Sequence, residues 1–213
     1  MIFKKESLDL IKIFYIMQKL LTTVFSNNNS EYINWDKEYQ NGQWDYLKNL
    51  DELAHYSIII GYYNYLKPRG SILDVGSGEG LLQKRILAYS YSKYVGIDGS
   101  LEAINRASPK TDNKTFFLKE DMHNYSTKKA FDVIVFNESL YYSDNPLKVI
   151  RKFENYLDKK GIFIVSMYKP NFPISIFVYL IWKKISKEYK LIDETIIKNK
   201  LGQKWICRVY TKF

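Results

Sequence analysis

The chain has 213 residues, of which 46% are hydrophobic, and a formal net charge of +9. This length and apolar content predict one well-packed domain over residues 1–213, and the single cysteine, Cys207, excludes an internal disulfide framework and fits a reducing cytoplasm. The charge is uneven, because residues 138–213 hold 15 basic and 7 acidic side chains. We interpret this segment as a solvated lysine-rich surface in preference to a binding site for a specific anionic partner.

Residues 1–30 are expected to form an amphipathic helical extension that packs on the domain or on a second subunit. The apolar run at residues 8–25 is interrupted by polar and charged side chains from Asp9 to Lys19. It is therefore predicted not to span a membrane. Glu6 and Asp9 also lie where a secretory signal carries only positive charge, so a signal peptide is not expected.

Apolar runs of strand length alternate with helical patterns in the middle of the chain. The expected strands are Ser71–Val75, Tyr94–Asp98, Thr115–Lys119, Phe131–Asn137 and Gly161–Met167. Helix-like stretches lie near residues 80–90, 100–107 and 145–157. Such alternation predicts parallel βαβ units with ligands at the carboxyl ends of the strands.

The end of the chain follows a different pattern. Ile192–Lys198 and Lys204–Thr211 are predicted to form an antiparallel hairpin at the sheet edge. The fold class is thus α/β, a Rossmann-like, doubly wound, mostly parallel seven-stranded sheet with an antiparallel C-terminal hairpin.

The segment before this hairpin, Pro173–Glu188, is too short to span a bilayer. We expect a helix that roofs the substrate pocket, with attachment to a membrane surface as the alternative.

A glycine-rich loop follows the first expected strand. The strand leads into Asp74, and then Gly76, Gly78 and Gly80 alternate before a helix begins at about Leu81 and runs to Ala88. Glycines at this spacing let the backbone turn sharply and approach a ligand closely, and the helix N-terminus favours a nucleotide. The third glycine comes one residue too early for the dinucleotide fingerprint. Asp74 would repel a pyrophosphate and suits a cationic ligand.

These residues resemble the first motif of the class I S-adenosylmethionine-dependent methyltransferases, and four later elements of that family follow in order. The resemblance covers about residues 32–211. It implies that acids at the ends of the second and third strands hold the ribose and the adenine, that the next side chain packs on the ring, and that the end of the fourth strand faces the methyl group. The cofactor-binding residues that it implies are Asp74, Gly76, Gly78, Gly80, Asp98, Gly99, Asp121, Met122 and Asn137.

The segment Trp35–Tyr46 precedes this core and is rich in aromatic residues. In similar small-molecule methyltransferases such a stretch folds over the cofactor as a lid, which excludes water from the site. On that basis residues 31–66 form a lid and a leading helix ahead of a catalytic core at 67–213, and Trp35 and Tyr39 contact the cofactor. Simple aromatic packing is an equal alternative.

Candidates for the general base lie after the fourth strand. If a helical turn follows, Glu138 and Tyr142 are four residues apart and share a face. Glu138 would accept a proton, Tyr142 would position the acceptor, and His123 is the second candidate for the base. His55 is expected to be structural. No acid cluster has convincing spacing for a metal, so transfer without a metal is expected.

The predicted function is transfer of a methyl group to a hydroxyl or amino group of a small polar metabolite, such as a sugar or sugar-phosphate precursor of a surface polysaccharide. Lysines after Glu138 are expected to meet a phosphorylated or nucleotide-linked substrate. The alternative is an RNA or other nucleic-acid methyltransferase, although the fourth strand lacks the proline-rich run that grips a flipped base. A non-enzymatic module is a third possibility. A cytoplasmic location and a homodimer complete the prediction.

Overall fold

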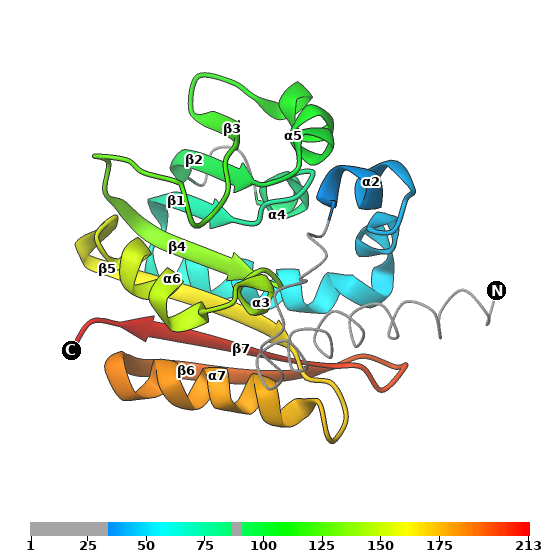
Figure 1. Ribbon diagram of the computed structural model, residues 1–213. Coiled ribbons are helices and arrows are strands. Elements are labelled where there is room, and N and C mark those ends of the chain that lie inside the picture. Colours follow the sequence, from blue (N-terminus) through cyan, green and yellow to red (C-terminus); the bar gives the residue numbers. More distant parts are fainter. Residues whose placement is uncertain (1–33, 87–90) are drawn as a thin grey trace.

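The fold is a seven-stranded sheet with helices on both faces, as described for residues 34–86 and 91–213 of a computed structural model (Figure 1). The strands are β1 Arg69–Val75, β2 Tyr91–Asp98, β3 Thr115–Lys119, β4 Phe131–Asn137, β5 Leu157–Tyr168, β6 Lys190–Lys198 and β7 Lys204–Thr211. The helices are α2 Trp35–Gln40, α3 Leu50–Leu66, α4 Leu81–Arg85, α5 Leu101–Ala107, α6 Pro146–Glu154 and α7 Ser175–Glu188. The expected N-terminal helix lies outside the described residues.

The strand order is β3-β2-β1-β4-β5-β7-β6. The first five strands along the chain pair in parallel, whereas β7 is antiparallel to both β5 and β6. β7 alone therefore runs against the others. This arrangement confirms the predicted fold class, including the C-terminal hairpin.

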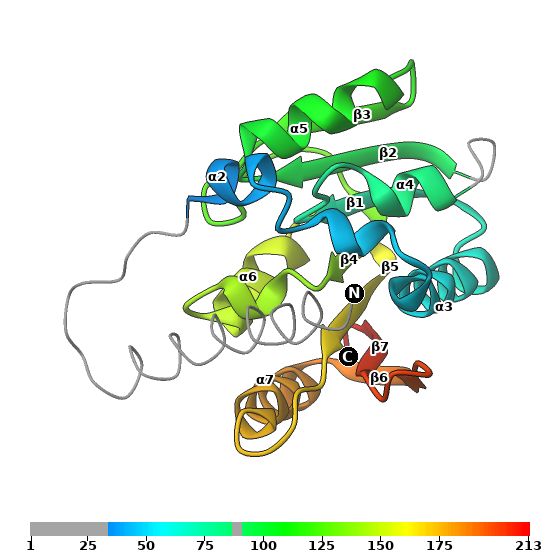
Figure 2. The same ribbon diagram turned by 90° about the vertical axis from the view of Figure 1, so that its right-hand side faces the viewer.

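Each face of the sheet is covered by its own set of helices (Figure 2). One buried cluster joins the sheet to α3, α4 and α5, and the other joins it to α6 and α7. The central strands are buried along most of their length, as expected for parallel strands covered on both sides. Because β1, β2 and β4 are parallel neighbours, the polar residues at their carboxyl ends lie at one edge of the sheet, where the loops after these strands meet.

The prediction that Pro173–Glu188 roofs the substrate pocket is wrong. α7 buries Val178, Ile181, Trp182 and Ile185 in the cluster shared with α6 and the sheet, and none of its residues lines the pocket described below. α7 lies in the long connection from β5 to β6. Its apolar face covers the outer part of the sheet, which would otherwise be exposed to water. Within the described residues, no helix is both long enough and apolar enough to cross a bilayer. The cytoplasmic location stays a prediction.

Candidate functional site

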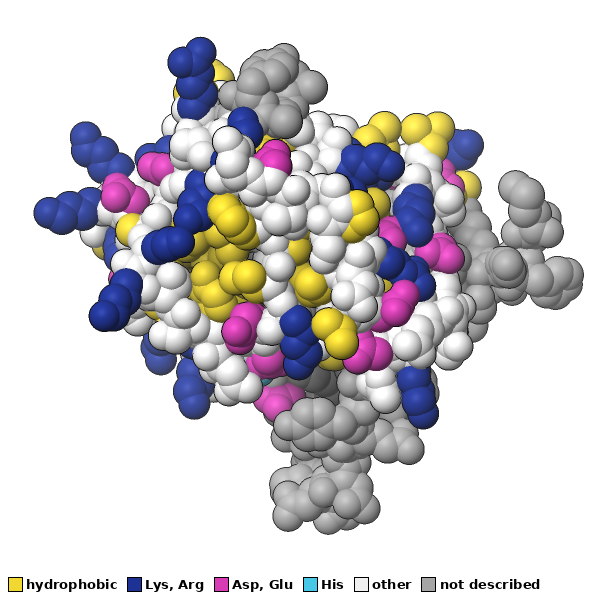
Figure 3. All heavy atoms as spheres, turned by 90° about the horizontal axis from the view of Figure 1, so that it is seen from above, with side chains coloured by type: hydrophobic (Ala, Val, Ile, Leu, Met, Phe, Trp, Pro, Cys, Tyr) yellow, Lys and Arg dark blue, Asp and Glu magenta, His cyan; other side chains and the backbone are white. Residues whose placement is uncertain are grey.

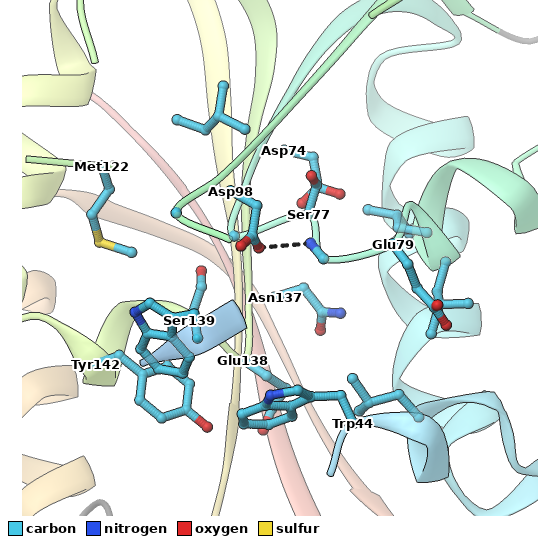
Figure 4. Close-up of a pocket in the computed structure, with 18 of the residues that line it drawn as sticks. Trp44, Asp74, Ser77, Glu79, Asp98, Met122, Asn137, Glu138, Ser139 and Tyr142 are labelled. Carbon is cyan, nitrogen blue, oxygen red and sulfur yellow. Dashed lines mark hydrogen bonds between the residues drawn. The ribbon is translucent and has the colours of Figure 1, made fainter. Parts of the chain in front are cut away.

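A deep pocket opens at the carboxyl ends of β1, β2 and β4 (Figure 4). Its empty space, including the open mouth, is about 1140 Å³. Its lining combines glycines, carboxylates and aromatic rings: Trp35, Tyr39, Trp44, Tyr46, Leu47, Tyr56, Asp74, Gly76, Ser77, Gly78, Glu79, Leu81, Leu82, Ile97, Asp98, Gly99, Glu120, Asp121, Met122, His123, Asn137, Glu138, Ser139, Tyr141 and Tyr142. With the exception of Gly80, every residue predicted for the site from the sequence lines this pocket.

The glycine loop forms one wall, and its backbone conformation requires glycine. Gly76, Gly78 and Gly80 have φ angles of 77°, 54° and 72°, a region that L side chains rarely adopt. A Cβ atom on Gly78 would lie 2.6 Å from the hydroxyl of Tyr39. Gly80 lies behind the loop, where a Cβ atom would meet the ring of Phe117 at 2.7 Å. The loop thus brings bare backbone up to the pocket and leaves no room for side chains.

Asp98, the last residue of β2, holds this loop in place. Its carboxylate accepts hydrogen bonds from the backbone N–H groups of Gly78 and Ser100, both at 2.9 Å. Burial raises the pKa of Asp98 to about 6 against the effect of these two hydrogen bonds, and the neighbouring carboxylates of Asp36 and Asp121 raise it further. Asp98 therefore combines a structural role with a charge that faces the pocket.

Asp74 is almost fully buried, with 1% of its surface exposed. One carboxylate oxygen accepts a hydrogen bond from the hydroxyl of Tyr94, and the other has no hydrogen-bond partner among the described residues. Burial raises the pKa of Asp74 to about 7, although the bond from Tyr94 lowers it. A buried carboxylate with a free oxygen gains most from a cation or a hydrogen-bond donor brought in by a ligand.

The residues after β3 form the opposite side of the pocket. Asp121 accepts a hydrogen bond from the backbone N–H of His123 at 2.7 Å, which fixes its carboxylate at the rim. Met122 extends its thioether towards the cavity (Figure 4). His123 lines the mouth with an exposed side chain, a position that is open to solvent.

The segment before α3 forms one wall of the pocket and is fastened to α5. Asp36 accepts hydrogen bonds from the Ser100 hydroxyl at 2.7 Å and from the Glu102 N–H at 3.0 Å. Arg106 donates to the carbonyl of Tyr39 at 2.8 Å. These bonds hold the segment over the glycine loop in the structure described.

Four aromatic rings form one corner of the pocket, which we call the aromatic corner: Trp35, Trp44, Tyr46 and Tyr142. The ring of Tyr142 meets those of Trp35 and Trp44 edge to face, with centroids 5.1 and 6.2 Å apart. Trp44 also lies 6.3 Å from Tyr46. The rings pack on one another and also line the cavity, so packing and contact with a ligand are compatible roles for them.

Glu138 lies beside the aromatic corner (Figure 4), but the helical turn that was expected to place it on one face with Tyr142 does not form. Its backbone has a φ of 55°, so no α-helical turn follows β4, and Leu140–Tyr142 forms a 3-10 turn instead. The carboxylate of Glu138 accepts hydrogen bonds from the Tyr141 hydroxyl at 2.8 Å and from the Tyr168 N–H at 3.1 Å. Two neighbouring elements therefore fix its position at the pocket wall.

His55 has the buried place that was predicted, and it also reaches the pocket through Asn137. Its Nδ1 lies 3.1 Å from Asn137 Oδ1, and its Nε2 lies 3.2 Å from Glu52 Oε2. The imidazole is stacked on the ring of Trp205 at 5.2 Å. Because His55 engages the oxygen of the Asn137 amide, the NH₂ group of that amide is left for a ligand.

The charge of the pocket is opposite to that of the whole chain. Six carboxylates line it, and no Lys or Arg is among its described lining residues: Asp74, Glu79, Asp98, Glu120, Asp121 and Glu138. None of the lysines that follow Glu138 is itself among the lining residues, but Nζ of Lys152 donates to the carbonyls of Met122 and His123 at the rim. The contact of these lysines with a phosphorylated substrate stays a prediction. On the face seen in Figure 3, lysines and arginines are interspersed with acids and do not form one basic patch.

The residues present fit a cationic nucleoside cofactor. The free oxygen of Asp74 and the bare glycine loop provide a charge and a close approach, and the hydroxyl of Ser77 is buried with no hydrogen-bond partner in the described part of the chain. Trp44, Tyr46 and Ser77 were not predicted individually as site residues. Trp44 and Tyr46 lie in the aromatic segment that the sequence marks, but no local signal shows that they point inward.

Comparison with known proteins is consistent with this geometry. A family model described as a methyltransferase domain matches residues 66–208. A tRNA U34 carboxymethyltransferase of Photobacterium profundum is 35% identical over 102 residues, which cover 45% of this chain and 31% of that protein. A malonyl-[acyl-carrier protein] O-methyltransferase 1 of Ilyobacter polytropus is 28% identical over 105 residues, covering 48% and 39%. The matched segment thus spans only a third or so of these curated relatives.

Solved structures show the same fold. The N-methyltransferase NodS from Bradyrhizobium japonicum WM9, in complex with S-adenosyl-L-homocysteine, superposes with a TM-score of 0.70 at 16% sequence identity. The superposition covers 81% of this chain and 92% of that one.

Proposed function

This chain belongs to the methyltransferase domain family and has the class I fold that uses S-adenosylmethionine, and on that premise we propose that it methylates a hydroxyl or amino group of a small polar metabolite. The observation that carries the proposal is the pocket at the strand ends, where a glycine loop, buried carboxylates and an aromatic corner surround one cavity. When bound, the cofactor supplies a methyl group already activated on a sulfonium sulfur. The protein's part is to bind, align and deprotonate the acceptor.

We assign the cofactor to the side of the pocket formed by the glycine loop and the ends of β2 and β3. Asp74 meets positive charge with its free oxygen, Asp98 and Asp121 offer carboxylate oxygens to donor groups, and Met122 packs on a flat ring. The remaining members of this set are Gly76, Gly78, Gly80, Gly99, Asn137, Trp35 and Tyr39.

Glu138 is our candidate for the general base. Its carboxylate takes the proton that the acceptor loses from O–H or N–H, while the acceptor forms its bond to the methyl carbon and the carbon–sulfur bond breaks. The hydrogen bonds from Tyr141 and Tyr168 hold the carboxylate at the wall, so its orientation is set before the acceptor arrives. Tyr142 lies in position to contact the acceptor, and His123 at the mouth is the second candidate for the base.

The walls of the pocket favour a small acceptor. The segment over the glycine loop is fastened to α5, and the aromatic corner gives the acceptor flat, apolar walls beside one carboxylate. Sugars present both apolar ring faces and polar hydroxyl groups, so a sugar or a precursor of a surface polysaccharide matches these walls. Phosphorylated precursors are the less favoured members of that group because the lining is acidic.

RNA methylation is the second candidate, since several relatives are tRNA U34 carboxymethyltransferases, another is an mRNA cap guanine-N(7) methyltransferase, and the chain carries a net charge of +9. The acidic pocket favours the small metabolite. Chromatography on heparin and on RNA separates the two: a small-molecule enzyme is released at low salt. Retention at physiological salt would favour RNA.

The proposal is tested by calorimetry with S-adenosylmethionine and by a screen of polar metabolites for release of S-adenosylhomocysteine. With the best acceptor, Glu138→Gln is expected to keep the cofactor Kd within about threefold and to lower turnover at least about 100-fold, the scale of a lost general base. Glu188→Gln on α7, which lies away from the pocket, serves as the control. Undiminished turnover in Glu138→Gln would remove it from the mechanism, and absence of cofactor binding would contradict the proposed function itself.

A further inference from the structure

The pocket lining holds more negative charge than a sulfonium cofactor needs. Of the six carboxylates, we assigned Asp74, Asp98 and Asp121 to the cofactor, and Glu79 is neutralised by Lys48 at 2.9 Å. Glu138 is left at the acceptor side, with Glu120 exposed at the rim. No Lys or Arg is among the described lining residues.

The side chains around Glu138 are of a kind that binds cations. A cation is attracted to the face of an aromatic ring when it lies within about 6 Å of the ring centroid, and tryptophan is the strongest partner. The aromatic corner offers two tryptophans and two tyrosines whose neighbouring rings are inclined to one another by 37° to 87°. All four rings line the same cavity, and Glu138 adds a formal charge to its wall.

One buried hydrogen-bond donor in the same corner is free to bind a ligand. Nε1 of Trp44 is buried and has no hydrogen-bond partner among the described residues. An indole N–H is a donor only, so its partner must be an oxygen or another acceptor atom. A ligand that carries a hydroxyl oxygen close to its positive charge satisfies both Trp44 and Glu138.

We propose that the acceptor is a small amine with a neighbouring hydroxyl group, which enters as an ammonium ion and is held by the aromatic corner and Glu138. This inference rests on the proposed function and names its substrate class. The ammonium group gives one proton to the Glu138 carboxylate, and the freed nitrogen lone pair forms the bond to the methyl carbon. The carbon–sulfur bond breaks, its electron pair stays on sulfur, and Glu138 later returns its proton to solvent.

The test compares two probes of equal shape, choline and 3,3-dimethylbutan-1-ol, which differ in a charged nitrogen against a neutral carbon. Calorimetry is carried out on the full chain saturated with S-adenosylhomocysteine. In that complex the cofactor sulfur is a neutral thioether, so a preference for the cation belongs to the acceptor side. Choline is expected to bind at least tenfold more tightly than its neutral counterpart, and inorganic phosphate is expected not to bind in the pocket.

Substitutions show which side chains are responsible for the preference for choline over its neutral counterpart. Glu138→Gln and Trp44→Leu are each expected to reduce the preference for choline at least fivefold, whereas Trp44→Phe keeps part of it. Phe172→Leu, an exposed aromatic 81% accessible and outside the pocket lining, is the control and leaves the preference unchanged. Equal binding of the two probes, tighter binding of phosphate, or a preference that survives both pocket substitutions would overturn the inference. Binding of S-adenosylhomocysteine, measured first, separates these results from failure of the proposed function.

Discussion

Replacing Asp74 with asparagine is expected to stabilise the cofactor-free protein at alkaline pH and to weaken cofactor binding. Burial raises the pKa of this carboxyl from 3.8 to about 7 in the folded protein. At about 1.36 kcal/mol for each pH unit, the ionised form costs about 4 kcal/mol of folding free energy above pH 7. Asparagine has the same shape, keeps an oxygen for the hydroxyl of Tyr94 and cannot ionise.

The sign of the pH dependence follows from proton binding. Between pH 4 and 7 the folded protein holds a proton on Asp74 that the unfolded chain has released, so the free energy of unfolding falls as pH rises through this window. Above pH 7 Asp74 is ionised in both states, so its effect on the free energy of unfolding no longer changes with pH. The buried carboxyl of Asp98, with a pKa of about 6, contributes in the same direction and is common to both proteins. The difference between wild type and variant therefore reports Asp74 together with its repulsion from Asp98.

Urea denaturation of both proteins without cofactor, at pH 5 and at pH 8, measures this effect. Asp74→Asn is expected to be more stable than wild type by about 1.5 kcal/mol at pH 5, because the unfolded chain has already released its proton there, and by about 4 kcal/mol at pH 8. Calorimetry at pH 8 should show a loss of about tenfold or more in S-adenosylmethionine affinity, the scale of one charge-assisted hydrogen bond. Asp132→Asn at the opposite end of β4 is the control. Parallel stability curves for wild type and Asp74→Asn would refute the reasoning.

Two further substitutions test the walls of the pocket. Gly78→Ala places a Cβ atom 2.6 Å from the Tyr39 hydroxyl at a φ of 54°, and calorimetry should show cofactor affinity reduced at least tenfold. His55→Phe keeps a ring against Trp205 but removes both hydrogen bonds of the imidazole. It is expected to lower kcat/KM about tenfold in steady-state assays, whereas Ile59→Val, equally buried on the same helix, should change only the Tm. Normal kcat/KM in His55→Phe would show that Asn137 needs no support.

The sheet was predictable because its local signals agree with its global arrangement. β3 and β4 have the predicted bounds, and β1, β2 and β5 begin a few residues earlier than predicted. Apolar β-branched runs with polar ends identify parallel strands, and the carboxyl ends of such strands meet at one edge. The resemblance to the methyltransferases could therefore assign Asp74, Asp98 and Asp121 to one pocket, because each lies at or near the carboxyl end of such a strand.

The contacts that the sequence did not predict depend on backbone geometry or on residues far apart. The left-handed conformation of Glu138 turns its carboxylate to Tyr141, whereas a helical spacing would have favoured Tyr142. His55 and Asn137 are 82 residues apart and meet only once α3 has packed on the sheet. For α7 the apolar pattern defines a buried face, but it does not say whether that face meets the sheet or a pocket.

The net charge of the chain and the charge of its pocket act on different length scales. Exposed charges are screened beyond about 8 Å at physiological ionic strength, so the +9 of the whole chain has little influence on a ligand inside the cavity. There the six lining carboxylates are close to any ligand, and their negative charge is the basis for the cationic acceptor proposed above. A count of lysines along the sequence points to an anionic substrate, whereas the lining of the pocket favours a cation. On that proposal, the acceptor is selected by the carboxylates nearest to it and not by the net charge of the chain.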